Sequence, residues 1–560
     1  MKTSFEISRD VPLVHMRQYM AQLGLAEDDF DFYGKYQGKI RLEALERWQD
    51  RPDGKLILVT AMTPTLRGEG KTLTSVGIGQ AIGKLERRGM IALREPSLGP
   101  VFGMKGGATG GGYAQVIPME DINLHFNGDI HAITAAHNLL AAMLDNHIYQ
   151  GNERRVDVTR VLWPRALDMN DRALRHIVVG LGGHAHGIPR ESGFIITAAS
   201  EVMAILALAT GREDLKKRLG DIVIAYDQDY GAVTARDIGA DRAMAVILKD
   251  AIQPNLVQTI EHTPALVHAG PFANIAHGTS SVVAARTALK LADYVVTECG
   301  FGSDLGGEKF FDIVCRQSGL FPNAVVIVAT ARAIKRHGGV SEKPPELLEK
   351  ENMAAFDAGL VNLGAHVRGM QKFGVPIVVA LNRFPFDTEA EIAALRRFCD
   401  GLDVAFAPHD AFMRGGEGAT DLARVAMELA DSNPTPKPKF LYQLDEAPVE
   451  KVRRVAREIY GASDVYFERD AATKLERFVK MGYGHLPVCI AKTQYSLSDN
   501  PKLIGAPRDF TITVSDARLS AGAGFIVVVC GDMMLMPGLP VVPAAAKMDI
   551  DSSGTITGLF

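Results

Sequence analysis

The sequence predicts an α/β protein in which a mostly parallel sheet is covered by helices on both faces. Short, continuously apolar segments recur through the first three quarters of the chain, and stretches of helical periodicity separate them. Strands that are apolar throughout are typical of a parallel sheet buried between two helical layers. Apolar residues make up 47% and charged residues 23% of the 560 residues, which favours a folded globular protein over a disordered one.

The elements follow from this alternation. The first predicted strand is Lys55–Ala61, and after a loop a helix is predicted to begin near Lys71. Further strands are predicted at 221–226, 294–297, 324–329 and 376–381, with helices at 280–292 and 387–398. The most apolar long stretch, 194–209, is too short and too polar to span a bilayer, so it is predicted to be a buried helix.

A proline-rich segment at 432–439 predicts a domain boundary near residue 435. It has three prolines in eight residues and little capacity to fold. We therefore expect a large α/β domain at 1–435, with a smaller inserted lobe, and a smaller α+β domain at 436–560. The second part begins with a predicted helix at 450–460 and has β-rich segments at 509–514 and 525–530.

Charge and cysteine content exclude several classes of protein. The 61 Lys and Arg against 66 Asp and Glu give a net charge of −5, which argues against nucleic acid or an anionic membrane as a partner. The N-terminal residues contain no apolar core of signal-peptide length. The five cysteines are dispersed, without CxxC spacing, so we expect buried free thiols in a cytoplasmic protein.

The loop between the predicted strand at 55–61 and the helix from Lys71 has the pattern of a phosphate loop. It matches GxxxxGK[ST] except at its first position, and its residues are Thr65, Leu66, Arg67, Gly68, Glu69, Gly70, Lys71 and Thr72. Backbone amides, the helix N-terminus and the Lys71 charge would hold phosphate, and the Thr72 hydroxyl would reach Mg²⁺. This predicts a P-loop NTPase-like parallel sheet with flanking helices. The alternative is a glycine-rich turn that caps a helix.

Two further segments have the composition of a ligand site. Arg94 and Lys105 flank a glycine-rich stretch that ends at Gly112, and such glycine density suggests close approach of backbone to an anion. The segment 118–129 then packs three carboxylates and His125 into twelve residues, with Asp129 at its end. That composition suits a metal or proton-transfer site, and a solvated turn is an equal alternative.

Taken together, five segments resemble the formate–tetrahydrofolate ligase (10-formyltetrahydrofolate synthetase) family. They are 94–129, 271–278, 298–316, 486–499 and 536–543, and the similarity runs from 33–36 to 558–560. Segments of this length are far more specific than the phosphate loop alone. The resemblance argues against a different phosphate-loop ligase, such as the dethiobiotin synthetase type, and against a non-enzymatic nucleotide-dependent switch. ADP release that depends on both formate and tetrahydrofolate would separate these readings.

The resemblance implies substrates, partners and site residues. ATP with Mg²⁺ and formate would give formyl phosphate, which N10 of tetrahydrofolate attacks to give 10-formyltetrahydrofolate, ADP and phosphate. A homotetramer and a monovalent cation, K⁺ or NH₄⁺, are also implied. The implied catalytic residues are Lys71, Arg94, His125 and Asp129. Glu95 would lie near the cation, and Phe301, Phe384 and Phe412 would form the folate site.

Three positions depart from the family pattern. Leu66-Arg67 stands where the family usually has Pro-Ala, which adds a cation beside the phosphates. Phe412 stands where a pterin-stacking tryptophan is usual, so the stacking face is smaller. The segment 184–186, His-Ala-His, replaces Lys-x-Asn, and we expect a solvated loop there rather than a metal site.

Overall fold

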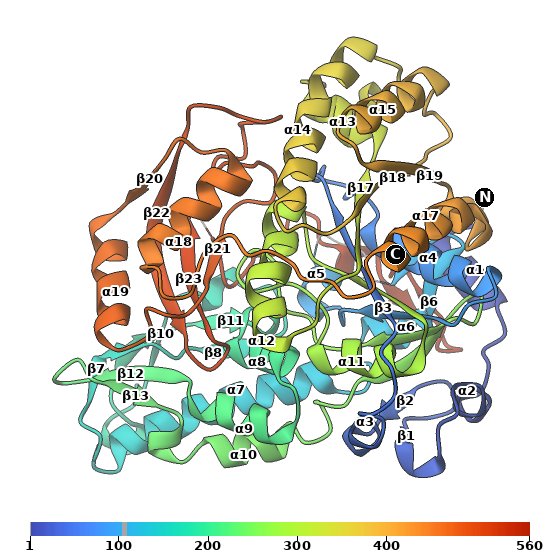
Figure 1. The fold of residues 1–560 in the computed structure, drawn as a ribbon. Helices are drawn as coiled ribbons and strands as arrows, with labels where there is room; N and C mark the ends of the chain where they lie inside the picture. Colours follow the sequence, from blue (N-terminus) through green and yellow to red (C-terminus); the bar gives the residue numbers. More distant parts are fainter. Residues whose placement is uncertain (1, 104–108, 532, 560) are drawn as a thin grey trace.

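A computed structural model describes residues 2–103, 109–531 and 533–559, and its centre is one large sheet (Figure 1). Seven strands of this sheet run parallel, and neighbours along it are far apart in sequence. In sheet order they are β15 (Pro264–Val267), β4 (Gly89–Leu93), β16 (Tyr294–Glu298), β3 (Lys55–Ala61), β17 (Ala324–Ala329), β18 (Ile377–Asn382) and β19 (Ala405–His409).

Strand β16 lies between β3 and β4, although it comes some two hundred residues later in the chain. Its Thr297 is paired with Leu58 on one side and with Ala92 on the other. The three strands therefore end at one level, and the loops that follow them meet at the same edge of the sheet. Shorter strands extend the sheet beyond β15 in antiparallel fashion: β14 (Asn255–Thr259), β2 (Gly38–Ile40), β1 (Phe30–Phe32), β6 (Ala114–Ile117) and β5 (Gly110–Gly111).

Alternate residues of β3 pack into different apolar clusters, as expected for a sheet covered on both faces. Ile57 and Val59 join the cluster that contains α4 (Lys71–Lys84) and α17 (Thr420–Ser432). Leu56 and Leu58 join the larger cluster, which contains α11 (Val282–Leu291) and α14 (Met353–Gln371). The predicted parallel sheet between helical layers is confirmed.

The elements around this centre fall into three groups (Figure 1), and α1 packs its Ile7 against Ile117 and Ile260. The first group precedes or covers the sheet: α1 (Ser4–Asp10), α2 (Met16–Leu23), α3 (Leu42–Arg47), α5 (Leu98–Phe102), α6 (Met119–Asn123), α12 (Arg316–Ser318), α13 (Ala331–His337), α15 (Glu389–Gly401) and α16 (Ala411–Arg414). The second lies between α6 and β14: α7 (Asp129–Tyr149), β7 (Val156–Val161), β8 (Arg165–Leu167), β9 (Ile177–Val179), β10 (Arg190–Ser192), β11 (Phe194–Ile196), α8 (Glu201–Leu208), α9 (Arg212–Gly220), β12 (Val223–Asp227), β13 (Ala232–Thr234) and α10 (Asp241–Ile247).

The third group follows α17. Its four-stranded sheet has the order β20 (Asp464–Phe467), β22 (Thr511–Ser520), β23 (Phe525–Cys530) and β21 (Val488–Ala491), with α18 (Pro448–Val455) and α19 (Arg469–Lys480). A short final pair, β24 (Asp549–Ile550) and β25 (Ile556–Thr557), ends the described chain. The proline-rich segment begins at the end of α17, where Asn433 and Asn323 exchange amide hydrogen bonds. The boundary near residue 435 remains a prediction.

Two sequence predictions about this architecture were wrong. The segment predicted as a main-sheet strand at 221–226 forms β12, which pairs antiparallel with β13 and β7 in a separate sheet. An apolar run shows that a strand is buried but does not identify its partner. The segment 194–209 is not one helix: β11 comes first, and Ser200 then caps α8 by accepting a hydrogen bond from the Val202 amide. The other predicted strands and helices are present.

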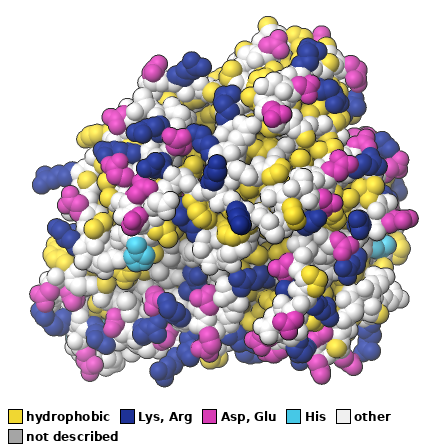
Figure 2. Space-filling view, viewed as in Figure 1, with side chains coloured by type: hydrophobic (Ala, Val, Ile, Leu, Met, Phe, Trp, Pro, Cys, Tyr) yellow, Lys and Arg dark blue, Asp and Glu magenta, His cyan; other side chains and the backbone are white. Residues whose placement is uncertain are grey.

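Two simpler expectations can also be compared with the structure. All five cysteines are buried free thiols, as predicted. Among the described residues, none of the helices is long and apolar enough to cross a membrane. On the face shown in Figure 2, Lys and Arg side chains are interspersed with Asp and Glu, as the near-balanced composition suggests.

Candidate active site

The predicted site residues gather where the parallel strands end. Arg94 follows β4, Phe301 follows β16, the loop 65–72 follows β3, Phe384 follows β18 and Phe412 follows β19. Because these strands are parallel, their carboxyl ends and the segments that leave them lie along one edge of the sheet. Ligands of open α/β sheets bind at this edge. Residues that span more than three hundred positions of the sequence, from Thr65 to Phe412, therefore lie along the same edge of the sheet.

The loop after β3 is shaped by two glycines and held by two carboxylates, of which Glu342 accepts a hydrogen bond from the Leu66 amide at 3.0 Å. Gly68 and Gly70 have φ values of +74° and +80°, which suit glycine, and Gly70 directly precedes α4. The Glu69 carboxylate accepts a hydrogen bond from the Thr65 amide at 2.6 Å and another from the Thr330 hydroxyl. Leu66 and Arg67 are exposed at the tip. The amides of Thr65, Leu66 and Gly68 are bonded within the protein, so the N-terminus of α4 is the part of the loop best suited to an anion.

Lys71 and Thr72 are the first two residues of α4, and both interact with a carboxylate on β16, Thr72 by a hydrogen bond and Lys71 through its charge. The Thr72 hydroxyl donates to Glu298 Oε2 at 2.9 Å, and Glu298 is only 2% exposed. Burial lowers the pKa of Lys71, and the negative charge of Glu298 opposes this effect. A lysine at the start of a helix, in a region of low polarity, is held ready to neutralise an incoming negative charge.

Arg94 completes this cluster from the other side of β16. Its guanidinium lies 3.8 Å from Glu298 Oε1 and donates to the Pro271 carbonyl at 3.3 Å. Its Nε atom is buried and, among the described residues, has no hydrogen-bond partner. A Cβ atom on Gly300 would lie 2.5 Å from the Ala273 Cβ and 2.9 Å from Arg94 Nη1, so glycine lets the turn pack closely against both side chains. The arginine is placed with hydrogen-bonding capacity to spare.

Glu298 is the functional candidate that the sequence analysis missed. It links the Thr72 hydroxyl to the Arg94 guanidinium, so it joins the phosphate-loop segment to the anion-binding arginine. The available signal was a carboxylate at the end of the apolar segment 294–297, directly before a glycine-rich turn. Without the strand order, nothing in the sequence shows that this strand ends between the other two.

Glu95 and Asp129 lie close enough to influence each other. Asp129 is buried, 2.8 Å from Lys39 Nζ, and accepts from the Asn255 amide at 2.7 Å. Burial raises the pKa of Glu95 well above its usual range, and the charge of Asp129 raises it further. Glu95 Oε2 is buried without a hydrogen-bond partner among the described residues. This carboxyl group therefore has an oxygen with unused capacity to accept a hydrogen bond or to contact a cation.

His125 stands apart from this pair. It lies between α6 and α7, and its side chain is exposed, whereas Asp129 begins α7 and is buried. Lys105, predicted to flank the glycine-rich stretch, is outside the described residues, as are positions 104–108 as a whole. His184 and His186 are both exposed, in a single turn of 3₁₀ helix.

The three predicted aromatic residues have different surroundings. Phe301 sits in the turn after β16 with a φ of +58°. The Phe384 ring is stacked with Phe386, with centroids 5.4 Å apart, and the Arg332 guanidinium lies 3.9 Å from its centroid. Arg332 therefore already covers one face of Phe384, which leaves the ring less area for a further planar group. The sequence analysis did not identify Arg332 as part of this region.

Phe412 is 39% exposed and packs against the hairpin of β5 and β6. Its carbonyl accepts from the Tyr113 amide at 2.9 Å. A Cβ atom on Gly112, where φ is +56°, would lie 2.1 Å from the Phe412 carbonyl oxygen, and one on Gly111 would touch the ring at 3.5 Å. The high glycine content at the end of this stretch thus reflects close approach of backbone to Phe412.

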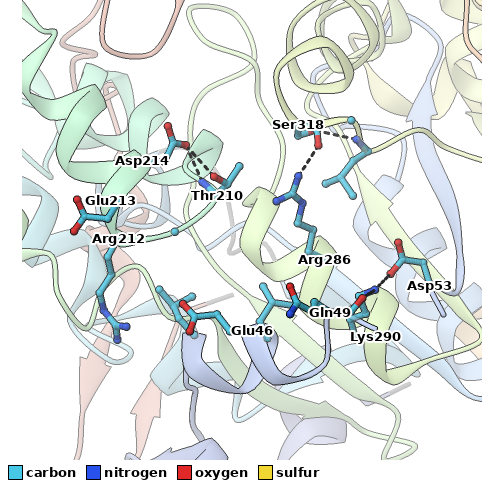
Figure 3. Close-up of a pocket in the computed structure, with 15 residues that line it drawn as sticks. Glu46, Gln49, Asp53, Thr210, Arg212, Glu213, Asp214, Arg286, Lys290 and Ser318 are labelled. Carbon is cyan, nitrogen blue, oxygen red and sulfur yellow. Dashed lines mark hydrogen bonds and ion pairs between the residues drawn. The ribbon is translucent and has the colours of Figure 1, made fainter. Parts of the chain in front are cut away.

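The opposite ends of the same strands also border cavities. One, of about 670 Å³, is lined by residues of α3, the start of α9, α11 and the segment after α12 (Figure 3). Most of its charged side chains have partners within the protein. Lys290 pairs with Asp53 at 2.7 Å, Arg286 donates to the Ser318 carbonyl at 2.7 Å, and Asp214 accepts from the Thr210 amide.

Comparison with known protein families gives one match. The family model described as formate–tetrahydrofolate ligase matches residues 2–560, which is essentially the whole chain. The match covers both the strand-end cluster and the region after α17, and it gives no support to a ligase of the dethiobiotin synthetase type.

Proposed function

The chain belongs to the formate–tetrahydrofolate ligase family, whose members are ATP-dependent C–N ligases, and we propose that it forms 10-formyltetrahydrofolate through formyl phosphate. A carboxylate oxygen of formate attacks the terminal phosphorus of ATP, and ADP leaves. N10 of tetrahydrofolate then attacks the formyl carbon, phosphate leaves with the bonding electrons, and the N10 proton passes to solvent or a base. The observation that supports this proposal best is Glu298, which joins the Thr72 and Arg94 side chains.

In this proposal the loop 65–72 is P-loop NTPase-like and holds the ATP phosphates. The α4 N-terminus faces the phosphate oxygens, and Lys71 neutralises the charge that develops during transfer. Thr72 and Glu298 supply two adjacent oxygens, which is the donor type that Mg²⁺ prefers. When bound there, Mg²⁺ would offset negative charge on the phosphates.

Arg94 binds formate and then formyl phosphate. Its planar guanidinium can present two donors to a carboxylate or phosphate, and it lies across Glu298 from the start of α4. Fixing both reactants in this way removes much of the entropic cost of bringing a weak nucleophile to phosphorus. Formyl phosphate carries more negative charge than formate, so Arg94 and Lys71 should bind it more tightly.

The pair Glu95 and Asp129 is proposed to serve the monovalent cation. The buried, unpartnered Glu95 Oε2 atom fits such an ion, K⁺ or NH₄⁺, because it offers a carboxylate oxygen that is otherwise unsatisfied. Asp129 is already bonded to Lys39 and Asn255, so its contribution is electrostatic. The exposed His125 has a clearer path to solvent and suits a role in proton exchange.

The folate site is proposed at the ends of β16, β18 and β19. Phe301, Phe384 and Phe412 supply aromatic faces for the flat pterin. With Arg332 on one face of Phe384, we expect Phe412 to provide much of the remaining stacking area, since its ring is partly exposed.

Assembly and domain organisation stay proposals. The proline-rich segment suggests the division into 1–435 and 436–560, the family resemblance implies the homotetramer, and the dispersed cysteines suggest the cytoplasmic location. Size-exclusion chromatography with light scattering measures the assembly directly, and limited proteolysis near residue 435 measures the boundary.

The decisive experiment for the proposed function omits one substrate at a time. ADP release should require formate, and full turnover should require tetrahydrofolate. With tetrahydrofolate replaced by hydroxylamine, ATP and formate should yield formyl hydroxamate, because hydroxylamine captures an acyl phosphate. Rapid ADP release without formate, or no hydroxamate above a heat-denatured control, would refute the formyl phosphate route.

A further inference from the structure

The turn that carries Phe301 has almost no freedom of its own. Residues 299–304 begin at the end of β16, and the Gly300 amide donates to the Gly278 carbonyl at 2.8 Å. A Cβ atom on Gly302 would lie 2.5 Å from Asp304 Oδ1 and 3.2 Å from His366 Cε1. The position of the turn is therefore determined by the side chains packed beneath it.

His366, on α14, connects this turn to the base of the phosphate loop. Its Nδ1 lies 2.7 Å from the Ser303 hydroxyl, and its Nε2 lies 2.8 Å from the Thr63 hydroxyl. Thr63 follows β3, two residues before the loop 65–72 begins. Burial lowers the pKa of His366 to about 4, so the ring is neutral and has one donor and one acceptor for the two hydroxyls.

Lys492, from the segment after β21, holds the same turn from the other side. Its Nζ lies 2.7 Å from Asp304 Oδ2 and donates to the Ser496 carbonyl at 2.6 Å. Both side chains of the ion pair are at most 1% exposed. The resembling segment 486–499 contributes nothing to the strand-end cluster described above, and this ion pair gives it a connection to that cluster.

We propose that His366 and Lys492 are positioning residues, which fix the turn 299–304 and Phe301 at a set distance from the phosphate loop. We refer to His366, Lys492 and Asp304 as the clamp. This inference rests on the proposed function, because it concerns the distance between the phosphate and folate sites. Formyl phosphate made over the loop must lie within reach of the folate nitrogen, and a misplacement of about 1 Å can lower the rate roughly a hundredfold.

The chain offers matched controls for both residues. His137 is likewise a buried histidine with two hydrogen bonds, to the Ser200 hydroxyl and the Pro164 carbonyl, but it lies on α7. Lys451 is a buried lysine of the same C-terminal region, and its Nζ donates to the carbonyls of Leu444, Gly484 and Leu486. Neither control contacts the turn through these bonds.

The first test compares His366→Ala with His137→Ala. Both should lower the melting temperature, but only His366→Ala should lower kcat for the full reaction, by about tenfold or more. Hydroxamate formation should be reduced far less. Hydroxylamine reacts with formyl phosphate directly, so its rate does not depend on the distance between the phosphate loop and the folate site. His366→Gln, which keeps one donor and one acceptor, should recover part of kcat.

The second test concerns the ion pair. Lys492→Met leaves the Asp304 charge buried and unpaired, and we expect that single variant to be strongly destabilised. The double variant, Lys492→Met with Asp304→Asn, removes both charges and avoids this penalty. The double variant should raise KM for tetrahydrofolate and lower kcat, while Lys451→Met leaves both within about twofold of the wild-type values.

Wild-type kinetic constants in His366→Ala and in the double variant, at melting temperatures like those of the controls, would overturn the clamp. A uniform loss of full turnover and hydroxamate formation would overturn it too, since that outcome shows general damage. Failure of the proposed function would be visible earlier, as a wild-type enzyme that releases ADP without formate.

Discussion

The two ends of the parallel sheet differ in how their charged groups are satisfied. At the carboxyl ends, Arg94 Nε, Glu95 Oε2 and Arg332 Nε are buried without hydrogen-bond partners among the described residues. At the amino ends, the cations around the cavity of Figure 3 are paired within the protein, as in Lys290 with Asp53. Both ends are rich in charge, and both border concave regions.

Unpartnered polar atoms also occur elsewhere in the described residues, as at Gln80 beside a second cavity at the amino ends, so incomplete pairing alone does not mark a site. At the carboxyl ends it coincides with two arginines, Arg94 and Arg332, that could bind an anion. A buried polar atom without a partner costs free energy, so it persists in a folded protein when a ligand supplies the missing partner. The amino-end charges stabilise the fold by neutralising each other and offer little to an incoming molecule. The predictions below test this distinction with paired substitutions at the two ends.

The largest expected effect is at Lys71. Lys71→Ala should lower turnover by roughly a hundredfold or more, because one preorganised charge stabiliser is lost from the phosphate site. Lys290→Ala at the amino end, which also removes a helix-borne lysine, should leave turnover unchanged. Steady-state assays of both folded variants check this, and unchanged turnover in Lys71→Ala would remove the loop from the mechanism.

The next effect tests geometry rather than charge. Arg94→Lys keeps the positive charge but loses the two-donor face, so turnover should fall by at least about tenfold. Arg286→Lys at the amino end, where the guanidinium donates to one carbonyl, should be nearly neutral. The pair is compared by kcat/KM for formate. Near-normal activity in Arg94→Lys would show that the planar fork has no role.

A smaller and more selective effect is expected at Phe412. Phe412→Ala should weaken tetrahydrofolate binding by about 1–3 kcal/mol, by analogy with base–aromatic stacking, and leave KM for ATP and formate nearly unchanged. Phe412→Trp should tighten folate binding if the ring has space. The three Michaelis constants and a melting temperature separate a stacking role from a packing role, in which all three substrates would be affected alike.

The smallest effect on turnover is expected at Glu201, a carboxyl group at neither end of the sheet, whose ionisation affects stability instead. Glu201 accepts from the amides of Gly522 and Ala523, and burial raises its pKa from 4.5 to about 8. Between these values the folded protein holds a proton that the unfolded chain has lost. Its stabilising contribution is therefore complete below pH 4.5 and is lost as the pH rises towards 8, by at most about 1.4 kcal/mol per pH unit.

Urea unfolding of wild type and Glu201→Gln from pH 5 to pH 9 measures this contribution. The variant cannot ionise at this position, so its free energy of unfolding should fall less steeply with pH than that of the wild type. Parallel curves for the two proteins would show that Glu201 keeps an ordinary pKa. Turnover should be similar in both, because Glu201 is remote from the strand-end cluster.

Sequence patterns predicted the strand, glycine-bearing loop and helix start of the loop segment because those signals are local. The segment 55–72 contains an apolar strand, a glycine-bearing loop and a helix start within eighteen residues, and all three are present. The family resemblance, which the comparison confirmed, likewise came from short contiguous segments of the sequence. In contrast, the strand at 221–226 was assigned to the wrong sheet, because its pairing partners are not encoded in its own residues.

The missed residues share one cause. Glu298, Lys39 and Arg332 matter through a neighbour that lies far away in sequence, respectively Thr72, Asp129 and Phe384. Each contact depends on the strand order or on helix packing, which no single segment specifies. Residues such as Lys71 and Arg94 were proposed from sequence because their candidate roles depend on their own charge and local motif.

The position of β16 between β3 and β4 also has a consequence for biosynthesis. Strands β3 and β4 are consecutive in the chain, yet they do not pair with each other; each pairs with β16 instead. A nascent chain that has passed Arg94 therefore still lacks the strand that brings Arg94 and Lys71 together. Long-range pairing of this kind closes a large loop and slows folding. The anion-binding pocket should thus appear late on the ribosome, only after Tyr294–Glu298 has emerged, which spares the cell a half-made protein that sequesters ATP.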